Sequence, residues 1–127
     1  SGEEMRRLTG PAEGVLSLSF SPDGKMLASG GADGKIHLWD ANSGDSLGQL
    51  GGDMKSVNSL AFSPDGSLLA AGCASEDNLR LWDVNTATEI LRLRAHTSSI
   101  TGVAFSADGM ILASGAASGD VRLWGVP

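Results

Sequence analysis

One unit of sequence occurs three times in this chain. The stretch "FSPDGKMLASGGADGKIHLWD" at 20–40 returns as "FSPDGSLLAAGCASEDNLRLWD" at 62–83 and as "FSADGMILASGAASGDVRLWG" at 105–125. The Phe that opens each copy and the Trp near its end recur with a period of about 42 residues. A repeat of this size is usually one supersecondary unit that cannot bury its own apolar faces. The repeat therefore predicts a row of like units stacked on one another.

Each unit is predicted to contain three short β-strands. The turn "SPDG" or "SADG" separates the first two strands, because Pro presets its own backbone angle and Gly tolerates positive φ. In the third strand aliphatic residues alternate with a long polar residue and the Trp, which is the period-two pattern of a strand. The nine predicted strands are 15–20, 25–30, 35–40, 57–62, 67–72, 78–83, 100–105, 110–115 and 120–125.

A fourth and more polar segment follows the first two units. It covers 46–50 and 88–93, and in both places it ends in Leu. The third unit is followed by no such segment within the 127 residues, but "EEMRRL" at 3–8 precedes the first unit and also ends in Leu. We therefore expect three copies of each of four strands, a to d, with one strand d displaced to the front.

The turn "FSPDG", the strand "LASG" and the endings "IHLWD" and "LRLWD" resemble the WD-repeat β-propellers. The resemblance covers residues 3–127. It implies an all-β fold of three four-stranded antiparallel blades around a channel, with strand a innermost and strand d outermost. We expect a single domain over 1–127, with repeat units at about 10–52, 53–95 and 96–127.

The resemblance also implies a structural hydrogen-bonded tetrad of His, Ser or Thr, Asp and Trp in each blade. This chain departs from the pattern, because Pro11 and Asp53 stand where His is expected, Ala71 where Ser is expected and Ser118 where Asp is expected. In the second unit Glu76 or Asp77 falls in the turn that would hold the Asp. The tetrad positions that remain are Ser29, Asp33, Trp39, Trp82, His96, Ser114 and Trp124.

Three blades cannot close a ring, since propellers typically have about 4–8. The third unit would expose strand c as an unpaired edge, which is a template for another chain. We expect the front segment to pair with that edge in a neighbouring copy, giving six blades as a dimer or nine as a trimer. The alternative is that the chain is an excised or engineered piece of a longer propeller. The expected ring-closing residues are Met5, Arg6, Arg7, Leu8, Val121 and Leu123.

Charge and composition argue against several partners. The formal net charge of −6 disfavours nucleic acid and anionic membranes, which attract basic surfaces. The single cysteine, Cys73, excludes an internal disulfide and a Cys-based zinc cluster, and its apolar surroundings predict a buried thiol. There is no apolar run of about 18 residues and no secretory signal, so we expect a cytoplasmic chain. We expect no cofactor.

The sequence favours binding over catalysis. Asp23, Asp65 and Asp108 occupy one place in the same turn, whereas an active site needs different groups converging. His37 and His96 lie in different units and lack the setting of a nucleophile. We therefore expect no enzyme.

The resemblance implies protein or peptide binding on the channel-mouth loops, although these loops can equally be ordinary solvated turns. A purely structural unit, whose main property is ring formation, is the other alternative. The candidate loop residues are Glu13, Met54, Lys55, Glu76, Asp77 and Arg94.

Overall fold

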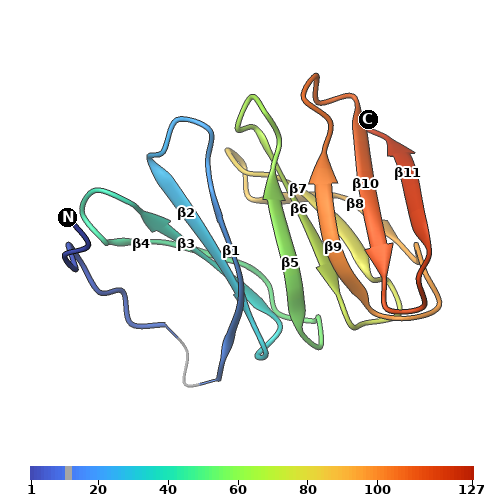
Figure 1. Ribbon diagram of the computed structural model, residues 1–127, viewed down its shortest axis with the longest axis horizontal. Coiled ribbons are helices and arrows are strands. Elements are labelled where there is room, and N and C mark those ends of the chain that lie inside the picture. The colour runs from blue at the N-terminus through green and yellow to red at the C-terminus, as the bar shows by residue number, and fades with distance from the viewer. Residues whose placement is uncertain (11–12) are drawn as a thin grey trace.

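Three antiparallel β-sheets stand side by side in the computed structural model, which describes residues 1–10 and 13–127 (Figure 1). Strands are the only regular elements among these residues, which confirms the predicted all-β fold. The first sheet contains β1 (Val15–Phe20), β2 (Met26–Gly31), β3 (Lys35–Asp40) and β4 (Ser46–Gly51). The second contains β5 (Val57–Phe62), β6 (Leu68–Cys73), β7 (Leu79–Asp83) and β8 (Thr88–Leu93). The third contains β9 (Ile100–Phe105), β10 (Ile111–Ala116) and β11 (Val121–Gly125).

The serine and aspartate of each repeated turn close the hairpin between the first two strands of a sheet. In the first sheet Ser21 Oγ donates to Asp23 Oδ1 at 2.6 Å, and the backbone N of Lys25 donates to the same oxygen at 2.9 Å. The backbone N of Met26 then donates to Ser21 Oγ at 3.0 Å, and Gly24 takes a φ of 72°. The same bonds recur in the other two sheets. Because residue 25 belongs to this turn, β2 begins at Met26, one residue later than the sequence predicts.

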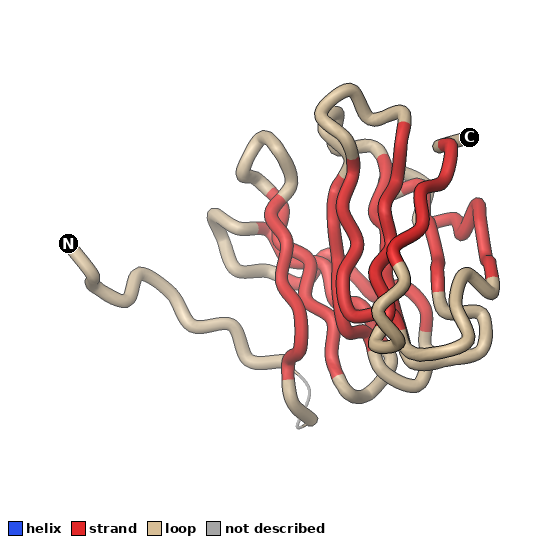
Figure 2. The backbone as a smooth tube through the Cα atoms, turned by 45° about the vertical axis from the view of Figure 1, so that its right-hand side comes forward, coloured by secondary structure: helices blue, strands red, loops and turns tan. Residues whose placement is uncertain are grey.

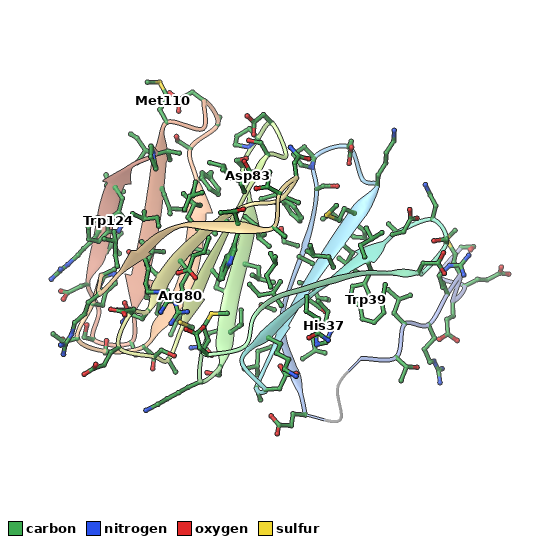
Figure 3. The ribbon with its side chains drawn as sticks, turned by 180° about the vertical axis from the view of Figure 1, so that it is seen from behind. His37, Trp39, Arg80, Asp83, Met110 and Trp124 are labelled. Atoms are coloured by element: carbon green, nitrogen blue, oxygen red, sulfur yellow. The ribbon has the colours of Figure 1, made fainter. Side chains whose placement is uncertain are left out.

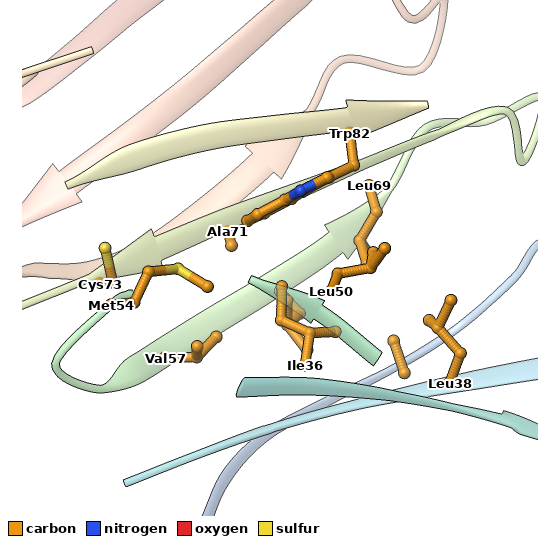
Figure 4. Packing of buried hydrophobic residues seen from close by; sticks show 11 residues of the cluster. Ile36, Leu38, Leu50, Met54, Val57, Leu69, Ala71, Cys73 and Trp82 are labelled. Carbon is orange, nitrogen blue, oxygen red and sulfur yellow. The ribbon is translucent and has the colours of Figure 1, made fainter. Parts of the chain in front are cut away.

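The core consists of two apolar clusters, one in each gap between neighbouring sheets. In the first gap Ile36 and Leu38 of β3 pack with Val57 and Leu69 of the second sheet (Figure 4). In the second gap Leu79 and Leu81 of β7 pack with Ile100 and Leu112 of the third sheet. Each sheet therefore has a leading face, which receives the sheet before it, and a trailing face, which packs on the sheet after it.

A glycine in the middle strand lets neighbouring sheets approach closely. A Cβ added at Gly30 would lie 2.5 Å from Val57 Cγ1, and one added at Gly72 would overlap Ile100 Cγ2. Gly115 has the same place in β10, but the nearest atom to its added Cβ is Gly102 O at 4.0 Å. The third glycine therefore faces open space in this chain.

Residues 1–10 form no strand, so the predicted outer strand 3–8 is absent as a strand from the single chain. Figures 1 and 2 show this segment leaving the first sheet on the side away from the third sheet. A Cβ added at Gly44 would lie 3.0 Å from Leu8 Cδ2, so Leu8 passes close to the turn before β4. The segment and β11 thus lie at opposite ends of the molecule.

Candidate functional site

The trailing face of the third sheet is an exposed apolar surface. Val121 and Leu123 of β11 are 74% and 68% exposed, whereas Leu79 and Leu81, at the same places in β7, are 0% exposed. The face is therefore built like the two buried trailing faces, but none of the other sheets in the described residues packs against it. We define the trailing face by Ala113, Val121 and Leu123.

The leading face of the first sheet is the matching surface at the other end. Phe20 is 62% exposed, and Leu18 is equally exposed, although Leu60 at the place of Leu18 in β5 is buried. Apolar residues in a single protein rarely gather on a surface that no partner covers. We define the leading face by Val15, Leu18, Phe20, Leu27 and Trp39.

The outer edge of β11 is an unpaired strand edge. The strand order of the third sheet is β11-β10-β9, so β11 hydrogen-bonds only to β10. The corresponding strands β3 and β7 are each paired on both sides, the outer partners being β4 and β8. The third sheet is therefore one outer strand short within the described residues.

The residues predicted to supply that strand share the Glu, Arg and final Leu of β8 at the same spacing. The segment 3–8 reads "EEMRRL" and β8 reads "TEILRL". Arg7 Nε lies 2.9 Å from Glu4 Oε1, and Arg92 Nε lies 2.7 Å from Glu89 Oε1, at the same spacing along the chain. Residues 3–8 thus have the residue pattern of an outer strand without a sheet to join.

The tetrad positions form partial hydrogen-bonded chains in two sheets. Trp124 Nε1 donates to Ser114 Oγ at 2.9 Å, and Ser114 Oγ lies 2.8 Å from His96 Nε2. His96 Nδ1 is buried without a partner among the described residues, and Ser118 stands where Asp is expected.

The first sheet has a shorter chain of the same kind. Trp39 Nε1 donates to Ser29 Oγ at 3.0 Å, and Pro11 lies outside the described residues. Asp33 accepts a hydrogen bond from the backbone N of Lys35, and it lies 3.6 Å from His37 Nε2. Asp33 therefore closes a turn here.

A buried arginine replaces the tetrad in the second sheet, where Trp82 is buried beside Ala71. The side chain of Arg80, which is labelled in Figure 3, is 3% exposed, and its Nη1 donates to Asp53 Oδ1 at 2.7 Å. This bond lowers the pKa of Asp53, and Arg92 Nη2 lies 3.0 Å from Asp53 Oδ2. The sequence interpretation missed Arg80. The sequence signal for this ion pair was an acid at the position expected for His, together with an arginine on strand c of the same unit.

Asn78 is a second buried polar residue that the sequence interpretation missed. Its Nδ2 donates to the backbone oxygens of His96 and Ser98, each at 2.9 Å. Its Oδ1 accepts from the backbone N of Ala95 at 3.0 Å and of His96 at 3.3 Å. All four bonding positions of the amide are used, so Asn78 fixes the loop that leads into the third sheet.

The candidate loop residues fall into two groups. Lys55, Glu76 and Arg94 line a depression of about 420 Å³ between the second and third sheets, together with His96. Asp77 uses its backbone oxygen to accept from Arg80 Nε, and Glu13 is exposed at the start of the first sheet.

Met54 is a correction to the predicted loop surface. It is 5% exposed and packs in the first core cluster, where the added Cβ of Gly51 would overlap its methyl group. Its side chain therefore contributes to the core and not to a binding surface.

The three turn aspartates act as hydrogen-bond acceptors in their own hairpins. The hydroxyl of Ser63 is the main cause that lowers the pKa of Asp65 to about 2, and the pKa values of Asp23 and Asp108 are lowered by Ser21 and Ser106 in the same way. This geometry explains the repetition of the aspartate by turn structure alone.

Acid is therefore expected to weaken the fold through these turns. The folded pKa of Asp65 lies below the ordinary value of 3.8, so its stabilising effect is present above that pH and is lost as the pH falls toward about 2. The melting temperature should fall as the pH is lowered from 5 to 2, and the melting temperature of the Asp65→Asn variant should fall less steeply. Asp45→Asn, at an exposed carboxylate outside these turns, is the control and should follow the unmodified chain. A wild-type melting temperature that does not change across this range would contradict the prediction.

The described part of the chain also holds a free thiol but no cluster of metal ligands. Cys73 is buried and unpaired. No group of three or more His, Cys, Asp or Glu side chains converges within residues 1–10 and 13–127. None of these residues belongs to a helix long and apolar enough to cross a membrane.

Comparisons with known proteins match this geometry. The family model "WD domain, G-beta repeat" matches residues 2–40, 44–83 and 87–125. The Notchless protein homolog of Arabidopsis thaliana is 61% identical over 33 residues, which are 26% of this chain and 7% of that protein. Protein Notchless of Drosophila melanogaster is 56% identical over 36 residues, 28% of this chain and 7% of that protein. Protein Mut11 of Chlamydomonas reinhardtii is 51% identical over 37 residues, 29% of this chain and 10% of that protein.

These relatives share only a short segment with the chain, but the family model covers nearly all of it. Each of its three matches contains strands a, b and c of one sheet, and the strand-c tryptophans occupy equivalent positions. The chain therefore belongs to the WD-repeat family.

Proposed function

We propose that residues 1–127 form a non-catalytic WD-repeat scaffold that closes into a ring with further copies of itself. The leading face of one copy packs on the trailing face of the next, and residues 3–8 complete the third sheet of that neighbour. Two copies give six blades and three copies give nine. The observation that carries the proposal is the pair of exposed apolar end faces, which correspond residue by residue to the two buried interfaces.

The cost of leaving these surfaces open supports the proposal. Burial of one large aliphatic or aromatic side chain is worth about 1.5–3 kcal/mol, and the two faces hold several. An unpaired strand edge also invites association with another chain. Because the two end faces differ, the contact is head-to-tail, and a head-to-tail contact closes when the rotation between copies fits.

The family match is consistent with the role assigned to residues 3–8. The second match begins at residue 44 and the third at residue 87, each just before an outer strand. The first match begins at residue 2, just before the segment 3–8. In all three matches the outer-strand residues therefore precede strands a, b and c.

Native mass in dilute solution tests this function. The chain has a mass of 12.9 kDa, so six blades correspond to about 26 kDa and nine to about 39 kDa. Light scattering coupled to gel filtration separates these values. A folded species of 12.9 kDa that stays solitary at micromolar concentration would overturn the proposal.

A second candidate is that the open faces belong to further WD repeats of a longer polypeptide. The short matched share of the curated relatives, 7% to 10% of their length, favours this reading. Under it, residues 1–127 are an excised or engineered piece of a larger propeller with no binding role of their own. A longer chain with added repeats would then be monomeric, and residues 1–127 would not form a discrete dimer or trimer.

We further propose that the scaffold binds a protein or peptide on its loop face and works in the cytoplasm. WD-repeat proteins are generally protein-interaction scaffolds, and the depression beside Lys55, Glu76 and Arg94 lies on this face. Double substitution of Lys55 and Arg94 by Ser should weaken capture of a partner without changing the native mass. If the doubly substituted chain captures the partner as well as the unmodified chain does, the depression is not the binding site.

A further inference from the structure

We propose that residues 3–8 add to β11 of a second copy in one defined register, with Leu8 opposite Val121, Arg7 opposite Arg122 and Glu4 opposite Trp124. The inference rests on the proposed ring and specifies its joint. Its partner is another copy of this chain. The register comes from the two complete outer ladders within the chain.

The two complete ladders share one register and one irregularity. In the first sheet Ile36 pairs with Leu50, and a register shift falls between Leu38 and Trp39. In the second sheet Leu79 pairs with Leu93, and the shift falls between Leu81 and Trp82. The outer strand therefore pairs in the same way twice, including the bulge beside the tryptophan.

Transfer of this register to β11 gives three residues of the segment the same places as their counterparts on β8. Val121 is at the place of Leu79, so Leu8 takes the place of Leu93. Arg7 and Glu4 then take the places of Arg92 and Glu89, the two residues that form an ion pair on β8. The Arg7–Glu4 ion pair is already present in the free segment. The free segment thus already contains the Glu–Arg ion pair that the outer strand β8 carries.

The chain that follows the segment lies where the joint requires it. A Cβ added at Gly10, two residues after Leu8, would lie 3.9 Å from Trp39 Cζ2, and one added at Gly51, the last residue of β4, would lie 3.8 Å from Trp82 Cζ2. An outer strand leads into the next sheet past the tryptophan of that sheet. The chain from Leu8 to Gly10 therefore already runs toward the leading face of the first sheet, against which the third sheet of the neighbouring copy would pack.

One charge distinguishes this joint from the interface it copies. In the second sheet Asp53 bonds to Arg80 and also contacts Arg92, which face each other across the ladder. At the joint Arg122 faces Arg7, and His96 stands at the place of Asp53. Like charges directly opposite each other destabilise a sheet. The joint between copies is therefore less stabilised than the ladders within a copy.

Disulfide trapping tests the register, and Arg7 and Arg122 are suitable because neither belongs to the apolar faces. The double variant Arg7→Cys, Arg122→Cys is made in a Cys73→Ala background, since Ala116 shows that alanine fits this place in the repeat. Directly opposed positions in a sheet have Cβ atoms about 4.5–5.5 Å apart, close enough to bridge after a small adjustment. Oxidation should move the denatured mass from 12.9 kDa to about 26 or 39 kDa.

The matched control is Arg7→Cys with Gly125→Cys, which is displaced by three residues from Arg122, points to the other face of the sheet and leaves Val121 and Leu123 in place. It should stay at 12.9 kDa under the same oxidation. Faster bridging of this control, or a bridge within one chain, would overturn the register even if the native mass shows a ring. A native mass of 12.9 kDa before oxidation would instead overturn the proposed function.

Discussion

Deletion of residues 1–8 is expected to abolish the assembly and to convert the chain into aggregating material. The deletion removes the strand that the proposed ring offers to β11, whose outer edge has no partner in the described part of the chain. It also removes Leu8, which corresponds to the buried Leu50. Val121 and Leu123 would then stay in water, at a cost of about 1.5–3 kcal/mol for each side chain. Gel filtration with light scattering should show loss of the discrete ring and growth of large particles.

Single substitutions separate the loss of the strand from a general effect of truncation. Leu8→Asp should act like the deletion, because the joint would bury an unpaired charge. Met5→Ser is the matched control, since Met5 is 96% exposed and corresponds to the exposed Ile90 of β8. Met5→Ser should keep the native mass and the melting temperature. A truncated chain that keeps the native mass and the melting temperature would show that residues 1–8 do not join one copy to the next.

Much of the fold could be predicted because its causes are local and occur three times. The predicted ranges 15–20, 57–62 and 100–105 are those of β1, β5 and β9 in the structure. Each of these strands ends at a turn whose Ser, Asp and Gly determine the hairpin by their own bonds. Such signals require no knowledge of what lies elsewhere in the fold. Agreement between the three copies also removed ambiguity that one short apolar run would leave.

The polar contacts between sheets could not be predicted, because they depend on which backbone lies across the gap. Asn78 replaces Lys35 and Asp120 of the other units, and nothing in its own segment shows that the loop before β9 passes beside it. The buried Arg80 donates to Asp53, which lies in a loop 27 residues away along the chain. Sequence repetition indicates what the units share, whereas these contacts are what makes one interface different from the other.

Met54 shows the same limit for apolar residues. Its loop position predicts exposure, but the structure places its side chain over the space that Gly51 leaves. A glycine in the sequence indicates that a neighbouring group can approach closely, but it does not indicate which residue does so. The same question applies to Gly115, whose neighbour is absent from the single chain.

Substitution of Gly115 by valine is expected to block assembly while the chain itself stays folded. Among residues 1–10 and 13–127 the added Cβ meets only Gly102 O, at 4.0 Å, and the φ of Gly115 is not positive, so a β-branched residue suits the strand. In the proposed ring Val15 of the next copy would cover this place, as Val57 covers Gly30. The native mass should therefore fall to 12.9 kDa with the β-sheet circular dichroism retained.

The matched variant Gly72→Val gives the opposite pattern, because its partner lies in the same chain. The added Cβ would overlap Ile100 Cγ2, and overpacking of a core costs typically about 1–3 kcal/mol and more when the backbone cannot move. Gly72→Val should therefore lower the melting temperature or prevent folding. Gly115→Val should leave the melting temperature and the folding of the single chain unchanged, but the ring should no longer form. If Gly115→Val keeps the mass of the unmodified assembly, no second copy lies against this glycine, and the surface that the third sheet presents must be covered in another way.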